Sequence, residues 1–117
     1  MKKETNEEKK QWLELCNWLE INIFNYNIPY QRLQKESTLI LRGLKYGQRI
    51  ANNNCEKHGN YPSNVILMAF KANKIKILNA IKDKKFENES NKMRYVCSII
   101  RDDIDDIYNR YLKIKDK

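Results

Sequence analysis

The 117-residue sequence contains only three glycines and two prolines, and strand-like alternation of apolar and polar residues is scarce. Apolar residues instead recur at three- and four-residue spacing, which is typical of amphipathic helices. A chain of this length can bury a core without a metal or a disulfide. The sequence therefore predicts an all-α fold, a single domain of four or five helices over residues 1–117, with no sheet.

Long apolar runs are also missing. No stretch approaches the roughly 20 apolar residues that a membrane-spanning helix needs, and Met1–Thr5 lacks the apolar run of a signal peptide. The three cysteines, Cys16, Cys55 and Cys97, are odd in number and dispersed, which does not resemble the disulfide framework of a secreted domain. We therefore expect a cytoplasmic protein that has no membrane partner.

Histidine is limited to His58, which leaves few places for acid–base chemistry. Cys55 and His58 resemble half of a zinc knuckle, but a structural zinc site needs four ligands, and Cys16 and Cys97 fall on predicted core stripes. The same two residues could form a nucleophile pair, yet no orienting carboxylate accompanies them in a recognisable pattern. We expect neither a metal site nor catalysis in this loop.

Four aspartates form an acidic segment in the last helix: Asp102, Asp103, Asp105 and Asp106. Three of them share a helix face and could hold Mg²⁺ as a nuclease would. A simpler interpretation is that Arg101 pairs with Asp105 and Asp106 with Arg110 at i,i+4 spacing on an exposed face. We favour the second interpretation and expect a protein that is not an enzyme and that holds no metal or cofactor.

Turn and cap residues predict where the helices lie. A capping box opens at Thr5, the first helix ends at 25–27, Pro29 begins the second and Pro62 begins the third. Ser90 or Asn91 caps the last helix, where Met93, Val96, Cys97, Ile100, Ile104, Ile107 and Tyr111 make the core stripe. The predicted organisation is a front part at about 5–50, a loop at about 51–60, a rear helix pair at about 61–112 and a basic tail at 113–117.

Charge is the most informative property for function, because the net charge of +8 attracts polyanions. Cations concentrate around the turn between the last two predicted helices, where they could neutralise phosphates. We predict that Lys71, Lys74, Lys82 and Lys85 lie near one helix face. The candidate nucleic-acid-binding residues are Lys71, Lys74, Lys82, Lys84, Lys85, Lys92 and Arg94.

Aromatic side chains near these cations could stack on bases. The candidates are Tyr30, Tyr46, Tyr61 and Tyr95, although a tyrosine at the edge of a core is equally ordinary. Phe86 is expected to anchor the basic turn inward. The positive turn and the acidic segment make the surface dipolar, which suits an oriented partner or head-to-tail self-association. A homodimer is the other form of self-association considered.

The run Ile77-Leu78-Asn79-Ala80-Ile81, a lysine-rich turn, and then Tyr95 and Ile99 at helical spacing resemble the C-terminal domain of DnaD-type replication proteins. Asp103 stands where that family has a tryptophan. The resemblance covers roughly residues 61–108 and implies an all-helical domain that binds DNA and helps to load or remodel replication proteins. A looser likeness, through Arg42-Gly43-Leu44, is to small phage proteins.

Two functions follow as hypotheses. In the first, the protein is a non-enzymatic DNA-binding accessory factor of a phage or plasmid replication system, and Tyr95 and Ile99 hold the rear helices together. In the second, it is a phage-encoded inhibitor that binds a protein of a host defence system, as anti-CRISPR proteins do. The partner is accordingly nucleic acid or a host or phage protein.

Overall fold

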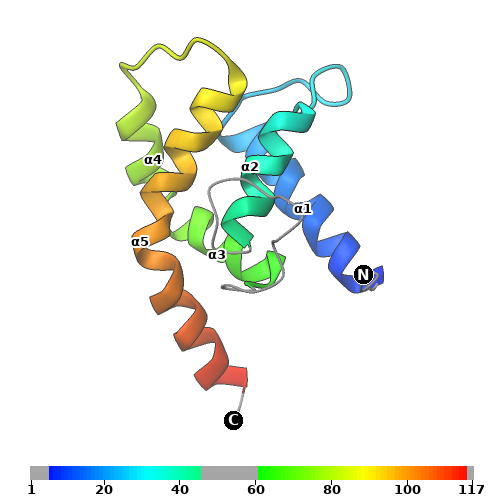
Figure 1. The fold of residues 1–117 in the computed structure, drawn as a ribbon, viewed down its shortest axis with the longest axis vertical. Coiled ribbons are helices and arrows are strands. Elements are labelled where there is room, and N and C mark those ends of the chain that lie inside the picture. Colours follow the sequence, from blue (N-terminus) through cyan, green and yellow to red (C-terminus); the bar gives the residue numbers. More distant parts are fainter. Residues whose placement is uncertain (1–5, 46–60, 116–117) are drawn as a thin grey trace.

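The computed structural model describes residues 6–45 and 61–115, and within these ranges the chain is all-α without a strand. The helices, shown in Figure 1, are α1 (Asn6–Asn22), α2 (Lys35–Lys45), α3 (Ser63–Ala72), α4 (Lys74–Ile81) and α5 (Glu89–Lys115). The predicted fold class, a single helical domain of four or five helices, is confirmed.

Helix α5 organises the molecule, because α2 and α3 both pack against it and α1 packs against α3 (Figure 1). Its 27 residues extend roughly 40 Å at the usual rise per residue. The predicted core stripe is fully buried from Met93 through Ile104, whereas Ile107 and Tyr111 are half-buried. Burying a large apolar side chain contributes about 1.5–3 kcal/mol, so this stripe makes a large contribution to the stability of the fold.

The front helices contribute the other side of the core. The apolar period predicts one inner stripe on the first helix and one inner face on the second, and the residues on them are buried in α1 and α2: Trp12, Leu15, Cys16 and Leu19, then Ser37, Ile40, Leu41 and Leu44. The buried apolar residues of these helices are Trp12, Leu15, Cys16, Leu19, Ile40, Leu41 and Leu44. The period of the apolar residues therefore identified the inner face of both helices correctly.

The connection between α1 and α2 is longer than predicted. Helix α1 ends at Asn22 rather than at 25–27, and Asn25 adopts a left-handed φ of 59°, which asparagine tolerates better than most residues. Helix α2 begins at Lys35 and not at Pro29, which instead lies in a turn, after a cis peptide bond, where Gln31 N donates to Asn27 O at 3.0 Å. The predicted start of the second helix is wrong because Pro29 lies in this turn, six residues before the helix begins at Lys35.

The predicted third helix is divided in two at Asn73. Its Nδ2 donates to Ala69 O at 2.9 Å, and its backbone N–H donates to the same oxygen at 3.1 Å. A side-chain amide that bonds to the backbone in this way competes with helix propagation, and Asn73 leaves the helical conformation at φ −104° and ψ 11°. The rear of the molecule therefore contains three helices rather than a pair.

Both ends of α5 also differ from the prediction. The helix begins at Glu89, and its cap is Asn88 rather than Ser90 or Asn91, since Asn88 Oδ1 accepts from Asn91 N at 2.9 Å. At the other end α5 continues through Lys115, so residues 113–115 of the predicted tail are helical, as expected where neither Gly nor Pro stops the helix. Thr5 and the predicted loop at 51–60 lie outside the described residues.

Candidate nucleic-acid interface

Residues 82–88 connect α4 to α5, and we call this connection together with the first turns of α5, residues 82–94, the basic elbow (Figure 1). Lys82, Lys84 and Lys85 are all exposed there. The elbow is anchored from below by α4, whose Ile77 is fully buried in the core. The elbow is therefore a surface feature on an ordered support.

Tyr95 orders the connection from the side of α5. The Phe86 ring packs on the Tyr95 ring with 5.6 Å between centroids, and Lys84 Nζ lies 4.7 Å from the Tyr95 centroid. Phe86 is half-buried, as the sequence predicts for an inward anchor. A cation near an aromatic ring is stabilised by roughly 0.5–1 kcal/mol at exposed sites, so Tyr95 restrains Lys84 while leaving its ammonium accessible.

Two further cations rise from the first turns of α5. Lys92 is half-buried, its Nζ lies 5.0 Å from the centroid of the Phe24 ring, and burial lowers the pKa of its ammonium because it disfavours the charged form. Arg94 Nη2 lies 3.5 Å from Glu36 Oε1, and both side chains are more than half exposed. Lys92 is thus constrained by its neighbours, whereas the described residues hold Arg94 only through a weak surface pair.

Lys71 and Lys74 do not join the elbow on one helix face. Because the helix breaks at Asn73 and α4 ends at Ile81, Lys71 belongs to α3 and Lys85 to the connection. Lys74 Nζ donates to Asn22 Oδ1 at 3.2 Å, which ties α4 to the end of α1. The prediction of one shared face for Lys71, Lys74, Lys82 and Lys85 is therefore wrong, although Lys71 itself is exposed.

The charges of the elbow are largely unneutralised by the rest of the described chain. Among its cations only Arg94 has a carboxylate partner within the described residues, while the exposed Asp83 and Glu87 accompany the lysines on the connection. The acidic segment 102–106 begins about 12 Å further along α5 than Arg94. Its Asp105 accepts a hydrogen bond from the Tyr61 hydroxyl instead, so it does not cover the elbow.

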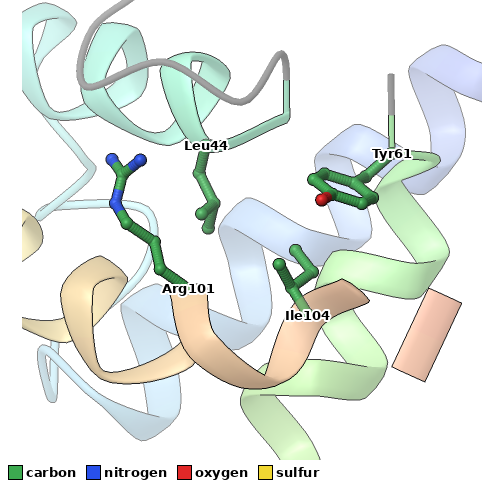
Figure 2. Close-up of a pocket in the computed structure, with 4 residues that line it drawn as sticks. All are labelled: Leu44, Tyr61, Arg101 and Ile104. Atoms are coloured by element: carbon green, nitrogen blue, oxygen red, sulfur yellow. The ribbon is translucent and has the colours of Figure 1, made fainter. Parts of the chain in front are cut away.

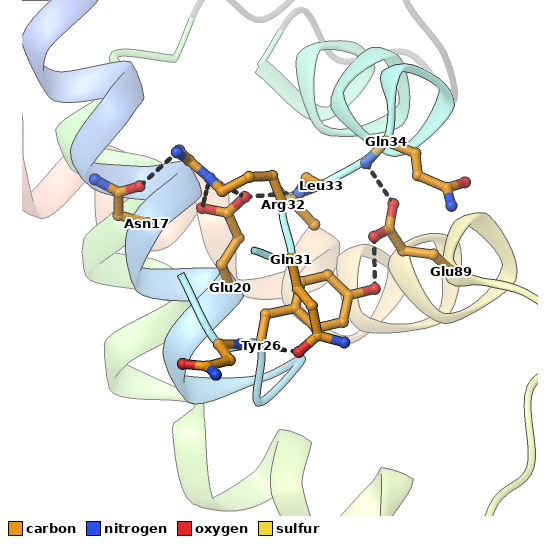
Figure 3. A network of polar contacts seen from close by, with 9 residues as sticks. Asn17, Glu20, Tyr26, Gln31, Arg32, Leu33, Gln34 and Glu89 are labelled. Atoms are coloured by element: carbon orange, nitrogen blue, oxygen red, sulfur yellow. Dashed lines mark hydrogen bonds and ion pairs between the residues drawn. The ribbon is translucent and has the colours of Figure 1, made fainter. Parts of the chain in front are cut away.

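Sequence reasoning missed a polar network beside the elbow, shown in Figure 3. Glu20 on α1 is buried, and its carboxylate accepts hydrogen bonds from Arg32 Nε at 3.0 Å and from the Leu33 backbone at 2.7 Å. Arg32 also donates to Asn17 Oδ1 at 3.0 Å. The signal for Glu20 was its four-residue spacing after Trp12 and Cys16, which places a carboxylate on the edge of the core stripe.

Glu89, at the start of α5, holds the connection between α1 and α2 from the side opposite Glu20. Its carboxylate accepts hydrogen bonds from the Tyr26 hydroxyl at 2.6 Å and from the Gln34 backbone N–H at 2.7 Å (Figure 3). It also accepts one from the Ser37 hydroxyl. Burial, and then the Glu89 carboxylate that accepts its hydrogen bond, raise the pKa of Tyr26. The Glu89 carboxylate therefore points inward, and three hydrogen-bond donors stabilise its negative charge.

A small cavity of about 220 Å³ is lined by Leu44, Tyr61, Arg101 and Ile104 (Figure 2). Leu44 and Ile104 give it an apolar wall, and the Arg101 guanidinium gives it a charge. Burial and Asp105 raise the pKa of Tyr61 to about 12, so its hydroxyl stays protonated at neutral pH. These four side chains include no nucleophile paired with a base, as hydrolytic chemistry would require.

The candidate stacking tyrosines differ in how exposed their rings are. Tyr30 is 86% exposed, whereas Tyr61 is buried and packs edge-to-face on Tyr108 with 5.4 Å between centroids. The ring of Tyr95 is already in contact with Phe86 and Lys84. Tyr46 lies outside the described residues. Of the described candidates, Tyr30 has the most exposed ring.

Cys55 and His58, the candidate half-site for zinc, also lie outside the described residues. Within the described ranges, no three His, Cys, Asp or Glu side chains gather closely enough to hold a metal ion. Burial raises the pKa of the Cys16 and Cys97 thiols to about 12, and such thiols are poor nucleophiles at neutral pH. Across residues 6–45 and 61–115, no helix has both the length and the apolar character to cross a bilayer.

The fold and the surface define a small all-α protein whose most distinctive feature is a basic elbow on an ordered helical support. The chain belongs to a phage family, since the family model described as SPbeta prophage protein YorH matches it over residues 1–117. No curated protein and no solved structure matches the chain. The phage origin agrees with the expected source, but nothing in these comparisons links the chain to DnaD-type domains.

Proposed function

We propose that this phage protein binds DNA through the basic elbow, without catalysis, as an accessory factor of phage replication in the host cytoplasm. The observation that carries the proposal is that Lys82, Lys84, Lys85 and Lys92 have no carboxylate partner within the described chain. Carboxylates that pair with such lysines would need to be displaced before phosphates could bind, and here that cost is absent.

The elbow also has the order that a binding surface needs. Phe86, Tyr95 and the capped start of α5 fix the connection, so the lysines are presented from a restrained backbone rather than from a free loop. Less conformational entropy is then lost on binding. Lysine contacts to phosphates release counterions, so affinity falls as salt rises, with a slope proportional to the number of contacts.

The test compares two double charge reversals by fluorescence anisotropy with single- and double-stranded DNA at low and moderate salt. Lys84→Glu with Lys85→Glu changes the elbow, and Lys9→Glu with Lys10→Glu changes two exposed lysines at the start of α1 by the same net charge. We expect the elbow variant to bind roughly tenfold or more weakly and to show a shallower salt dependence.

The α1 variant should lose much less affinity. Equal losses in both variants would show that binding follows net charge alone and would refute the elbow as the site. Absence of DNA binding by the unaltered protein at low salt would refute the proposed function itself.

A second candidate is an inhibitor that binds a protein of a host defence system. It is favoured by exposed apolar side chains on the outer side of the rear helices, where Ile75 is 74% and Met68 is 46% exposed. Exposed apolar residues rimmed by charge are common in protein interfaces. Stoichiometric recovery of one host protein in a pull-down that Ile75→Glu abolishes would support this candidate, and recovery of nucleic acid alone would oppose it.

A further inference from the structure

The last turns of α5 carry a surface that the proposed DNA contact does not use. Figure 1 shows this end of α5 running beyond α3. Ile114, near its end, is 74% exposed, and Ile107 is only half-buried although it continues the core stripe. A groove of about 310 Å³ lies beside this part of α5, between it and Ala72 and Asn73.

The charged residues along this side of the helix are sorted by sign. Asp103 and Asp106 come first, and Arg110 and Lys113 follow one to two turns later. At 100° per residue all four project from one flank of α5, next to Ile107 and Ile114. Asp103, Asp106 and Arg110 line the groove, so the acidic and basic halves belong to one continuous strip.

Such a strip is complementary to itself only in one orientation. If a second copy lies antiparallel, its basic half faces the acidic half of the first, and the same contacts occur twice around a two-fold axis. A parallel arrangement would instead bring like charges together, which opposes association. A two-fold pair also closes, unlike the head-to-tail association that the dipolar surface suggests.

We propose that the protein forms a two-fold dimer through the C-terminal turns of α5, with Asp103 and Asp106 of one copy facing Arg110 and Lys113 of the other. The pairing is centred near Tyr108, which brings Ile114 of the second copy to the end of the groove near Asp103. The contact is short, so we expect association in the micromolar range rather than a permanent dimer.

The dimer has a consequence for the elbow. Because α5 rises roughly 1.5 Å per residue, an antiparallel pair places the two elbows roughly 55 Å apart at opposite ends of the assembly. Two separated binding sites on one long polyanion would strengthen binding through effective concentration. The proposed dimer does not depend on DNA binding, because its contacts come from the C-terminal turns of α5 and not from the elbow.

The test uses complementary variants and sedimentation velocity from low to high micromolar concentration. One variant makes the strip wholly basic, with Asp103→Lys and Asp106→Lys, and the other makes it wholly acidic, with Arg110→Asp and Lys113→Asp. We expect the unaltered protein to dimerise and each variant alone to associate roughly tenfold or more weakly through like-charge repulsion.

An equimolar mixture of the two variants should regain association, as a heterodimer with opposite charges across the interface. A change that merely damaged the fold could not be rescued in this way, and circular dichroism of each variant checks that the helices persist. A monomer at every concentration, or association unaffected by either variant, would overturn the proposal.

Discussion

Two connections meet near the start of α5, and they use charge differently. The connection at 23–34 is held by two carboxylates, Glu20 from α1 and Glu89 from α5, and each of their four oxygens accepts at least one hydrogen bond. The connection at 82–88 exposes lysines that have no carboxylate partner within the described chain. The connection at 23–34 is held by hydrogen bonds. The connection at 82–88 is held by the contact between Phe86 and Tyr95, and its lysines remain accessible to a ligand.

The two connections show that charged side chains have two different roles in this chain. A charge that is buried and hydrogen-bonded stabilises the fold, and its removal leaves donors without partners. A charge left in water contributes little to stability and stays accessible to a ligand of opposite sign. The elbow meets the second description.

The largest expected effect is on Glu89. Replacing it with alanine leaves Gln34 N–H and the hydroxyls of Tyr26 and Ser37 without their acceptor. Hydrogen bonds to a charged group are worth about 1.5–3 kcal/mol each but are not additive within one carboxylate, so we expect the free energy of unfolding to fall by about 3 kcal/mol. Urea unfolding at neutral pH measures this change.

Glu87→Ala is the matched control, because it removes an exposed carboxylate two residues away. We expect that variant to change stability by less than about 0.5 kcal/mol. Similar losses at the two positions would contradict the distinction between the connections.

A smaller effect, which depends on pH, is expected for Tyr26→Phe. Loss of its hydrogen bond to Glu89 should lower stability by about 1 kcal/mol at neutral pH. The native pKa of Tyr26 is raised above its ordinary value of 10, so the hydroxyl stabilises the fold at lower pH. As pH rises above about 10, the tyrosine of the unfolded chain ionises first, and this contribution is progressively lost.

The difference in unfolding free energy between Tyr26→Phe and the unaltered protein should therefore narrow above pH 10. Tyr30→Phe is the control, since Tyr30 is 86% exposed and its replacement should change stability by less than about 0.5 kcal/mol. A gap that stays constant up to pH 12 would show that the Tyr26 contact with Glu89 does not contribute as described.

Sequence reasoning succeeded where one signal dominated. Apolar period identified the inner faces of α1, α2 and α5, and the local density of lysine located the elbow. It failed where a single side chain overrode that period: Asn73 broke a helix by bonding to Ala69 O, and Pro29 stayed in a turn. Glu20 and Glu89 could not be assigned because their partners, at 26 and 32–37, come together only in the folded chain.

The smallest expected effect is on Arg94, the one cation of the elbow with a carboxylate partner among the described residues. Glu36→Gln releases Arg94 from an exposed pair at 3.5 Å. Such pairs contribute about 0.2–1 kcal/mol, so stability should change by less than about 0.5 kcal/mol. DNA affinity at low salt should instead rise about twofold, because Arg94 becomes free to contact a phosphate and a nearby negative charge is removed.

Glu14→Gln, on the exposed side of α1, is the control. It removes the same charge at a distance from the elbow and should leave DNA affinity nearly unchanged. If both variants tighten binding equally, Arg94 is not a contact and the elbow ends at Lys92.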